Sequence, residues 1–316
     1  MGKLDDGILL DSSVYDESET TQDGTVFSDL IIMPKHKDRA DLINDGIIDK
    51  SIVSISFDGW DSHTAEVMAP YLYEKGIPFT VFVGFNDKYR ADAMTSERLQ
   101  AFHTIKQYGG EVQLYTSQPK ETFLGTTNYV EQYNQLKQAY DRFLTWGFEK
   151  PRFCAYSSGV SSEILDNVLH EFGIKAGRTT SEGTVGSNIS ETAFRYPSFY
   201  LCGKNFKDKN WNAINSTYWY KSRIPKFIMT HKITTDEDDS NNSADLTEAH
   251  FKSFIDDIAT YITQYGYVPM SLSQFWEYIH FPKDAKVGQH CLIWEGDNRQ
   301  HEYVKTELEW RELTKI

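Results

Sequence analysis

The most regular part of the chain begins with an apolar stretch that ends on a carboxylate. Residues 51–57 (Ser-Ile-Val-Ser-Ile-Ser-Phe) lead directly into Asp58, which predicts a buried strand with Asp58 at its carboxyl end. Residues 64–76 then carry apolar side chains at helical spacing, and residues 78–83 (Pro-Phe-Thr-Val-Phe-Val) again have the composition of a buried strand. A strand, a helix and a strand within about thirty residues form a βαβ unit, so we expect a parallel sheet.

The alternation of strands and helices continues along the chain to about residue 272. Helical periodicity recurs over residues 96–108, 129–146, 162–172 and 251–262. Runs typical of strands lie at residues 111–115, 151–156, 174–177, 194–201, 224–231 and 267–272. Repeated alternation of this kind predicts a closed barrel rather than a sandwich, and in such barrels the chemistry lies at the carboxyl ends of the strands.

The segments on either side of this region do not alternate in the same way. Residues 1–50 are polar and acidic in their first half, with one short strand predicted over Leu30–Met33, and residues 283–316 contain only short β-rich runs. We therefore divide the chain into an N-terminal arm (1–50), a barrel (51–282) and a small C-terminal β appendage (283–316). The predicted fold class is α/β, a distorted (β/α)7-8 barrel.

Composition excludes several kinds of partner. The net charge is −14, and lysine and arginine form no cluster, so we expect neither a nucleic-acid partner nor an anionic membrane surface. No apolar run reaches the roughly eighteen residues that a membrane-spanning helix needs, so we expect no membrane span. The three cysteines are widely spaced, which predicts neither a disulfide framework nor a zinc finger.

Several segments resemble one enzyme family. Ser56-Phe-Asp-Gly59, the helix behind it and Ile77–Val83 look like the first motif of polysaccharide deacetylases, the NodB-homology domains of carbohydrate esterase family 4, whose usual motif is Thr-Phe-Asp-Asp-Gly. Residues 153–159 (Phe-Cys-Ala-Tyr-Ser-Ser-Gly) are similar to a later segment of one deacetylase subgroup, and Met229-Thr-His231 to the late motif. The resemblance covers residues 51–280 and implies a NodB-type barrel.

The resemblance also implies roles for individual residues. Asp58 matches the catalytic base of the family and His231 matches its general acid, which protonates the leaving amine. A glycan is the implied ligand. The side chains that we expect to bind it at the barrel mouth are Tyr115, Tyr156, Ser157 and Trp60.

The metal-binding motifs of the family are altered in this chain. The family mechanism uses a divalent metal held by one Asp and two His side chains. Gly59, Tyr115 and Gln118 stand at those three positions; glycine offers no side chain, and tyrosine and glutamine are poor zinc ligands. We therefore predict no metal in the barrel mouth and no other cofactor. Asp61 and His63 could rebuild a site, although capping of the following helix is the simpler role for Asp61.

Two functions stay open from the sequence. In the first, the protein binds a cell-wall or surface glycan, and the metal-dependent deacetylation has been lost. In the second, it is a hydrolase that removes acetyl groups from a polysaccharide or peptidoglycan through Asp58 and His231. The altered ligand positions favour the first, because the metal supplies much of the transition-state stabilisation in this family.

The N-terminal region bears on location and partners. Residues 1–10 contain no apolar core long enough for a signal peptide, so we expect cytoplasmic synthesis, with extracellular action after release or within a virion. Residues 1–50 can bury little apolar surface by themselves. We therefore expect this arm to bind other protein subunits, with a phage tail or a similar assembly as the preferred case.

Overall fold

The computed structural model describes residues 30–32, 43–59, 64–84, 95–116, 128–180, 195–203, 225–231, 233–235, 246–294, 300–307 and 309–313. They belong to two compact units. The smaller unit takes its residues from both ends of the chain (Met1–Pro34, Phe281–Trp294 and Gln300–Ile316), and the larger one mainly spans Lys35–His280.

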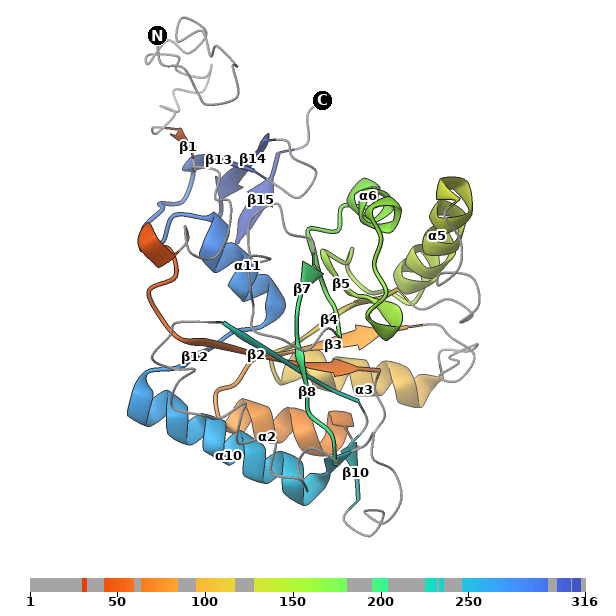
Figure 1. The fold of residues 1–316 in the computed structure, drawn as a ribbon, viewed down its shortest axis with the longest axis vertical. Helices are drawn as coiled ribbons and strands as arrows, with labels where there is room; N and C mark the ends of the chain where they lie inside the picture. Colours follow the sequence, from red (N-terminus) through yellow and green to blue (C-terminus); the bar gives the residue numbers. More distant parts are fainter. Residues whose placement is uncertain are drawn as a thin grey trace, which may run out of the picture. The chain divides into compact units, whose positions relative to one another are not determined.

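The larger unit is built on a parallel sheet, as the βαβ pattern predicted (Figure 1). Every pairing described in this sheet is parallel. In spatial order the strands are β7 (Arg195–Tyr196), β6 (Ala176–Arg178), β5 (Phe153–Ala155), β4 (Gly110–Tyr115), β3 (Phe79–Val83), β2 (Ile52–Asp58), β9 (Lys226–Thr230) and β8 (Phe199–Tyr200), with β12 (Val268–Pro269) also paired to β2.

The two edge strands of this sheet are consecutive in the chain. β7 pairs with β6, while β8, which begins only three residues after β7 ends, pairs with β9 on the opposite edge. The N–H of Thr179 donates to the carbonyl of Tyr196, and the N–H of Leu201 donates to that of Met229, both at 2.8 Å. Residues 195–200 therefore join the two edges, and the curled sheet confirms the predicted distorted (β/α) barrel.

Helices pack against the outer face of the sheet. Alternate strand residues such as Ile55, Phe57 and Val81 are buried in one apolar cluster with helix residues such as Leu72 and Phe251. α2 and α10 lie side by side (Figure 1) and are joined by a 2.6 Å hydrogen bond from the Tyr71 hydroxyl to Asp256. The helices are α2 (Ala69–Glu74), which follows the π-helical turn η2 (Thr64–Met68), α3 (Ser96–Gln107), α5 (Tyr129–Thr145), α6 (Glu163–Glu171), α10 (Glu248–Tyr265) and α11 (Leu272–His280).

Side-chain caps explain where several of these helices begin. The Asn128 side chain accepts hydrogen bonds from the N–H groups at the start of α5, and Ser162 and Thr247 do the same for α6 and α10. α10 ends at Gly266, whose φ of 70° is readily adopted only by glycine. A short parallel pair, β10 (Ile233–Thr234) with β11 (Leu246–Thr247), precedes α10. Among the helices of the described residues, none has the length and apolarity needed to cross a bilayer.

The inner face of the sheet is unusually polar, and hydrogen bonds connect its strands. On β2 the residues that alternate with the outward apolar ones are Ser54, Ser56 and Asp58, all buried. On β4 the Gln113 side chain accepts hydrogen bonds of 3.0 and 3.1 Å from the N–H groups of residues 152 and 153, which fixes the start of β5. These contacts satisfy polar groups that would otherwise be costly to bury.

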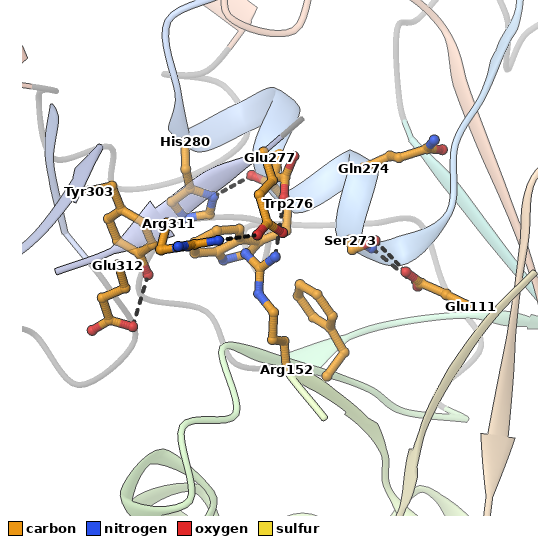
Figure 2. A network of polar contacts seen from close by, with 12 residues as sticks. Glu111, Arg152, Ser273, Gln274, Trp276, Glu277, His280, Tyr303, Arg311 and Glu312 are labelled. Carbon is orange, nitrogen blue, oxygen red and sulfur yellow. Dashed lines mark hydrogen bonds and ion pairs between the residues drawn. The ribbon is translucent and has the colours of Figure 1, made fainter. Parts of the chain in front are cut away.

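α11 lies at the amino-terminal end of the barrel strands. The Glu111 carboxylate, near the start of β4, accepts hydrogen bonds from the hydroxyl and N–H groups of Ser273 (Figure 2). It also accepts a 2.6 Å hydrogen bond from Thr80, near the start of β3. The ring of Phe275 packs edge-on against Tyr196 and Phe227. The N-terminus of α11 is thus fixed at the end of the barrel opposite to Asp58.

The smaller unit contains a four-stranded sheet. In spatial order its strands are β1 (Ile31–Ile32), β13 (His290–Trp294), β14 (Gln300–Lys305) and β15 (Trp310–Glu312). β1 runs parallel to β13, and the other pairs are antiparallel. Phe281 stacks on Trp310 with ring centroids 4.5 Å apart and meets Tyr303 edge-on. We predicted the arm (1–50) and the appendage (283–316) as separate segments; in the described part of the arm, strand β1 pairs with β13 of the appendage.

Gly177 allows close contact between β5 and β6 and leads to a prediction. A Cβ at this position would lie 2.4 Å from the ring of Tyr156 and 2.9 Å from the sulfur of Cys154. Overpacking of this kind costs about 1–3 kcal/mol. We expect Gly177→Ala to lower the free energy of unfolding by about that amount in urea denaturation. Ser253→Ala, an exposed change on α10, is the control and should stay within about 0.5 kcal/mol of wild type; equal stability of all three proteins would contradict the prediction.

Candidate functional site

Four residues that the sequence assigned to one site all lie at the carboxyl end of the barrel. Asp58 ends β2 and Tyr115 ends β4, while Tyr156 and His231 directly follow β5 and β9. The strands are parallel, so their carboxyl ends form one rim of the barrel, and all four residues lie at that rim. Because Phe57 is in register with Thr230, Asp58 and His231 occupy adjacent positions on β2 and the end of β9.

Asp58 forms a buried ion pair across the barrel. Its Oδ1 accepts a hydrogen bond from Nη2 of Arg178, the last residue of β6. The two side chains are only 2% and 1% exposed. The other terminal nitrogen of Arg178 lies 3.0 Å from the sulfur of Met229, and the guanidinium group lies 5.2 Å from the centre of the Phe82 ring. Side chains from β2, β3 and β9 thus surround the Arg178 cation.

This ion pair is incompletely hydrogen-bonded. Oδ2 of Asp58 and Nε of Arg178 are buried and have no hydrogen-bond partner among the residues described. A buried donor or acceptor left in this state costs about 1–3 kcal/mol, and more when the group is charged. The predicted catalytic base therefore has one oxygen bound by Arg178 and the other one unused.

Sequence reasoning did not identify Arg178, although a signal was present. The strand predicted over residues 174–177 ended one residue too early; the observed strand β6 ends at Arg178. The rule that functional side chains lie at the carboxyl ends of barrel strands would have selected this residue. Its partnership with Asp58 spans 120 residues of sequence and could not be predicted from local pattern.

Half-buried side chains lie at the rim around the ion pair. His231 and Tyr115 are both of intermediate exposure. The ring of Tyr200, which ends β8, meets His231 edge-on at 5.0 Å between centroids. Tyr200 was not among the predicted site residues, although it too ends a strand. Ser157 is half-buried, and its N–H donates a 3.0 Å hydrogen bond to the hydroxyl of Thr116.

Tyr156 lies on the face of the sheet that packs against the helices, whereas a glycan-binding residue was expected on the inner face. It is fully buried, and its hydroxyl donates a 2.6 Å hydrogen bond to Asp166 of α6. Arg195 binds the second oxygen of the same carboxylate at 2.7 Å. Burial and the nearby Asp166 charge raise the pKa of Tyr156 well above its usual value. In the structure Tyr156 therefore faces the helix layer, a correction to its expected place in the barrel mouth.

The donor set at the mouth does not fit the metal that the family resemblance implies. Gly59 has a φ of 84° and no side chain to offer a metal, and its N–H donates to the carbonyl of Phe82. Tyr115 offers a phenol, and the adjacent carboxylate of Asp58 is already paired with a cation. No group of three His, Cys, Asp or Glu side chains suited to a metal occurs within the described ranges. The other residues considered for this region, Trp60, Asp61, His63 and Gln118, lie outside the described residues.

Comparison with known proteins gives a match in structure only. No protein-family model and no curated protein matches the sequence. A putative polysaccharide deacetylase from Mycobacterium smegmatis matches with a TM-score of 0.50 and 14% identity, over 73% of this chain and 90% of its own. A family 4 carbohydrate esterase from Streptomyces lividans gives 0.43 and 15%, over 71% and 94% of the two chains. A CE4 family pseudoenzyme from Bacillus anthracis gives 0.44 and 12%, over 73% and 66%. The similarity to the mycobacterial protein shows that this chain has the NodB-type fold of the polysaccharide deacetylases.

Proposed function

We propose that this chain, which has the polysaccharide deacetylase fold, binds a cell-wall or surface glycan and does not carry out metal-dependent deacetylation. One observation carries the proposal: Asp58 pairs with the Arg178 cation in the barrel mouth, beside Gly59 and Tyr115 at positions where the family has metal ligands. A divalent cation placed there would meet a fixed positive charge and would lack the usual imidazole and carboxylate donors.

The rim supports a glycan as the ligand. Tyr115 and Tyr200 are half-buried at the carboxyl ends of their strands, and His231 lies against Tyr200. Aromatic side chains present a large apolar face together with a polar edge, which suits the mixed surface of a sugar ring. The net charge of −14 favours a neutral glycan over a polyanion.

We expect the full-length protein to bind peptidoglycan sacculi or chitooligosaccharides and to release no acetate from either, with or without added Zn²⁺ or Co²⁺. Tyr115→Ala and Tyr200→Ala should each weaken binding about fivefold, since an aromatic contact contributes about 1 kcal/mol. Binding is measured by sedimentation with sacculi and by calorimetry with chitotetraose, and acetate by an enzymatic assay. Tyr73→Ala is the matched control, because Tyr73 is an exposed tyrosine on α2.

A second candidate function is hydrolysis through Asp58 and His231 without the usual metal. The adjacent positions of these two residues at the rim favour it. Acetate release that persists in chelator and disappears in both Asp58→Asn and His231→Ala would establish this second function. It would also refute the proposal that catalysis is lost.

The predicted partner subunits remain a proposal. Of residues 1–50, the structure describes 30–32 and 43–50, and Ile31 and Ile32 pair with β13 of the same chain. Binding of the arm to other proteins, and incorporation into a virion or tail, are inferred from the small apolar surface that residues 1–50 can bury by themselves.

A further inference from the structure

We propose that the start of α5 and the end of α6 form a surface site for a cationic amino sugar, in the helix layer and outside the barrel mouth. These two helices are neighbours (Figure 1). The inference rests on the proposed glycan binding and adds a second contact, specific for sugar units whose nitrogen carries no acetyl group. The recognition elements are the rings of Tyr129 and Tyr133 and the carboxylate of Glu171.

The two tyrosine rings form one extended surface. Tyr129 and Tyr133 are one helical turn apart on α5, and their rings lie within 25° of parallel with centroids 6.3 Å apart. Parallel rings in direct face-to-face contact would be closer, so these two rings are displaced sideways. The ring of Tyr133 is supported by Phe172, directly after α6, at 5.1 Å between centroids. Tyr129 is 39% exposed, so a ligand can reach the outer end of this surface.

Glu171 fixes the first ring and places a negative charge beside it. The Tyr129 hydroxyl donates a hydrogen bond to Oε1 of Glu171, the last residue of α6. This hydrogen bond raises the pKa of Tyr129 to about 12, so the phenol stays a donor at neutral pH. The Glu171 side chain is exposed and forms no ion pair with a described lysine or arginine. The site therefore combines an oriented aromatic ring with a carboxylate that has no counter-ion among the described residues.

An ammonium group on a sugar ring matches this combination. The face of an aromatic ring attracts a cation, and a carboxylate binds an ammonium group through a charge-assisted hydrogen bond. A tyrosine ring also offers the apolar face and polar edge that suit a sugar. A neutral N-acetyl sugar would gain less from the charge of Glu171, and a uronate or a phosphate would be repelled by it.

Charges near the rings also favour a cation. Glu131, in the first turn of α5, is exposed. Lys137, one turn beyond Tyr133, already pairs with Asp141 at 2.5 Å. The net charge of −14 attracts a cationic glycan to the protein as a whole. Charge complementarity and the tyrosine surface thus select the same ligand class.

The test uses the full-length protein and a tetramer of glucosamine without acetyl groups, at pH 6. Calorimetry measures the affinity, and the ring signals of Tyr129 and Tyr133, assigned with Tyr129→Phe and Tyr133→Phe, report the place of binding by NMR. We expect the tetramer to shift both ring signals. Tyr129→Ala and Glu171→Gln should each weaken its binding at least threefold, and Glu171→Gln should also reduce the dependence of the affinity on salt.

Two matched controls use residues of the same kind elsewhere on the surface. Tyr265 on α10 is 41% exposed and follows Tyr261 by one turn, as Tyr133 follows Tyr129. Glu163 is exposed at the start of α6. Tyr265→Ala and Glu163→Gln should each leave the affinity for the glucosamine tetramer within twofold of wild type.

The possible failures of the two proposals are distinguishable. If the glucosamine tetramer leaves both ring signals unchanged, or binds Glu171→Gln as tightly as wild type, the amino-sugar site is wrong. Binding of chitotetraose and sacculi at the barrel mouth would then stand, because it depends on Tyr115 and Tyr200 and should be unchanged in Glu171→Gln. If neither tetramer binds and sacculi do not retain the protein, glycan binding itself fails and the amino-sugar site with it.

Discussion

Replacing Arg178 with methionine is expected to lower the free energy of unfolding of the barrel by about 3–5 kcal/mol, the usual cost of leaving one charge of a buried pair without its partner. Asp58 would keep its buried carboxylate, at 2% side-chain exposure, and would lose its only described hydrogen-bond donor. The variant would also lose the contact of the guanidinium group with the Phe82 ring. Urea denaturation followed by far-UV circular dichroism measures the difference.

The double variant Asp58→Asn with Arg178→Met separates loss of the charge pair from loss of packing. It removes both charges, so we expect it to be more stable than Arg178→Met alone. The interaction free energy between the two substitutions should be about 2 kcal/mol or more. Arg142→Met, at an exposed position of α5, should change stability by less than about 0.5 kcal/mol. Additive effects of the two substitutions would show that the charges do not stabilise each other and would contradict the ion-pair interpretation.

Much of the barrel could be predicted because its strands have a local signature. β2, β3 and β9 are buried strands of five to seven residues rich in apolar side chains, and each was predicted as a strand from its sequence. The closure of the barrel was not predictable in the same way. Residues 194–201 were expected to form one strand, whereas the structure divides them into β7 and β8, which pair with opposite edges. Only three-dimensional pairing reveals that division.

The local sequence pattern identified some residues of the candidate site and missed others. Asp58 and His231 were located because each ends a strongly apolar strand. Tyr156 was expected at the mouth because it ends the strand predicted over residues 151–156 and belongs to the segment that resembles the family; in the structure its side chain faces α6 instead. Arg178 lies in an equally short strand, and its partner is 120 residues away. Long-range charge pairing inside a barrel leaves no periodic trace in the sequence.

Lys226→Met is expected to stabilise the protein, and the gain should depend on pH. Lys226 is the first residue of β9, is 3% exposed, and lies over the ring of Tyr267 at 5.5 Å. Burial lowers the pKa of its ammonium group from 10.5 to about 7. A shift of this size corresponds to about 5 kcal/mol at most, at about 1.4 kcal/mol for each pKa unit.

The sign of the pH dependence follows from proton binding. Between pH 7 and pH 10.5 the unfolded chain keeps the proton on Lys226 while the folded protein loses it, so wild-type stability rises with pH across this window. Below pH 7 both states are protonated, and the folded state bears the full cost of the buried charge. We therefore expect the advantage of Lys226→Met to be largest near pH 6 and to shrink toward zero by pH 10.5. Urea denaturation of both proteins at several pH values measures this difference.

Two further variants make the Lys226 experiment specific. The arginine side chain of Lys226→Arg stays protonated throughout this pH range, whereas Lys226 loses its proton. The variant should therefore be less stable than wild type, most clearly above pH 7. Lys106→Met removes an exposed lysine of α3 that pairs with Glu149, and its stability should differ from wild type by less than about 1 kcal/mol. A constant stability difference between Lys226→Met and wild type from pH 6 to pH 10 would show that the Lys226 pKa is not lowered by burial. In that case the gain would come from side-chain packing, and the charge at the start of β9 would carry no cost.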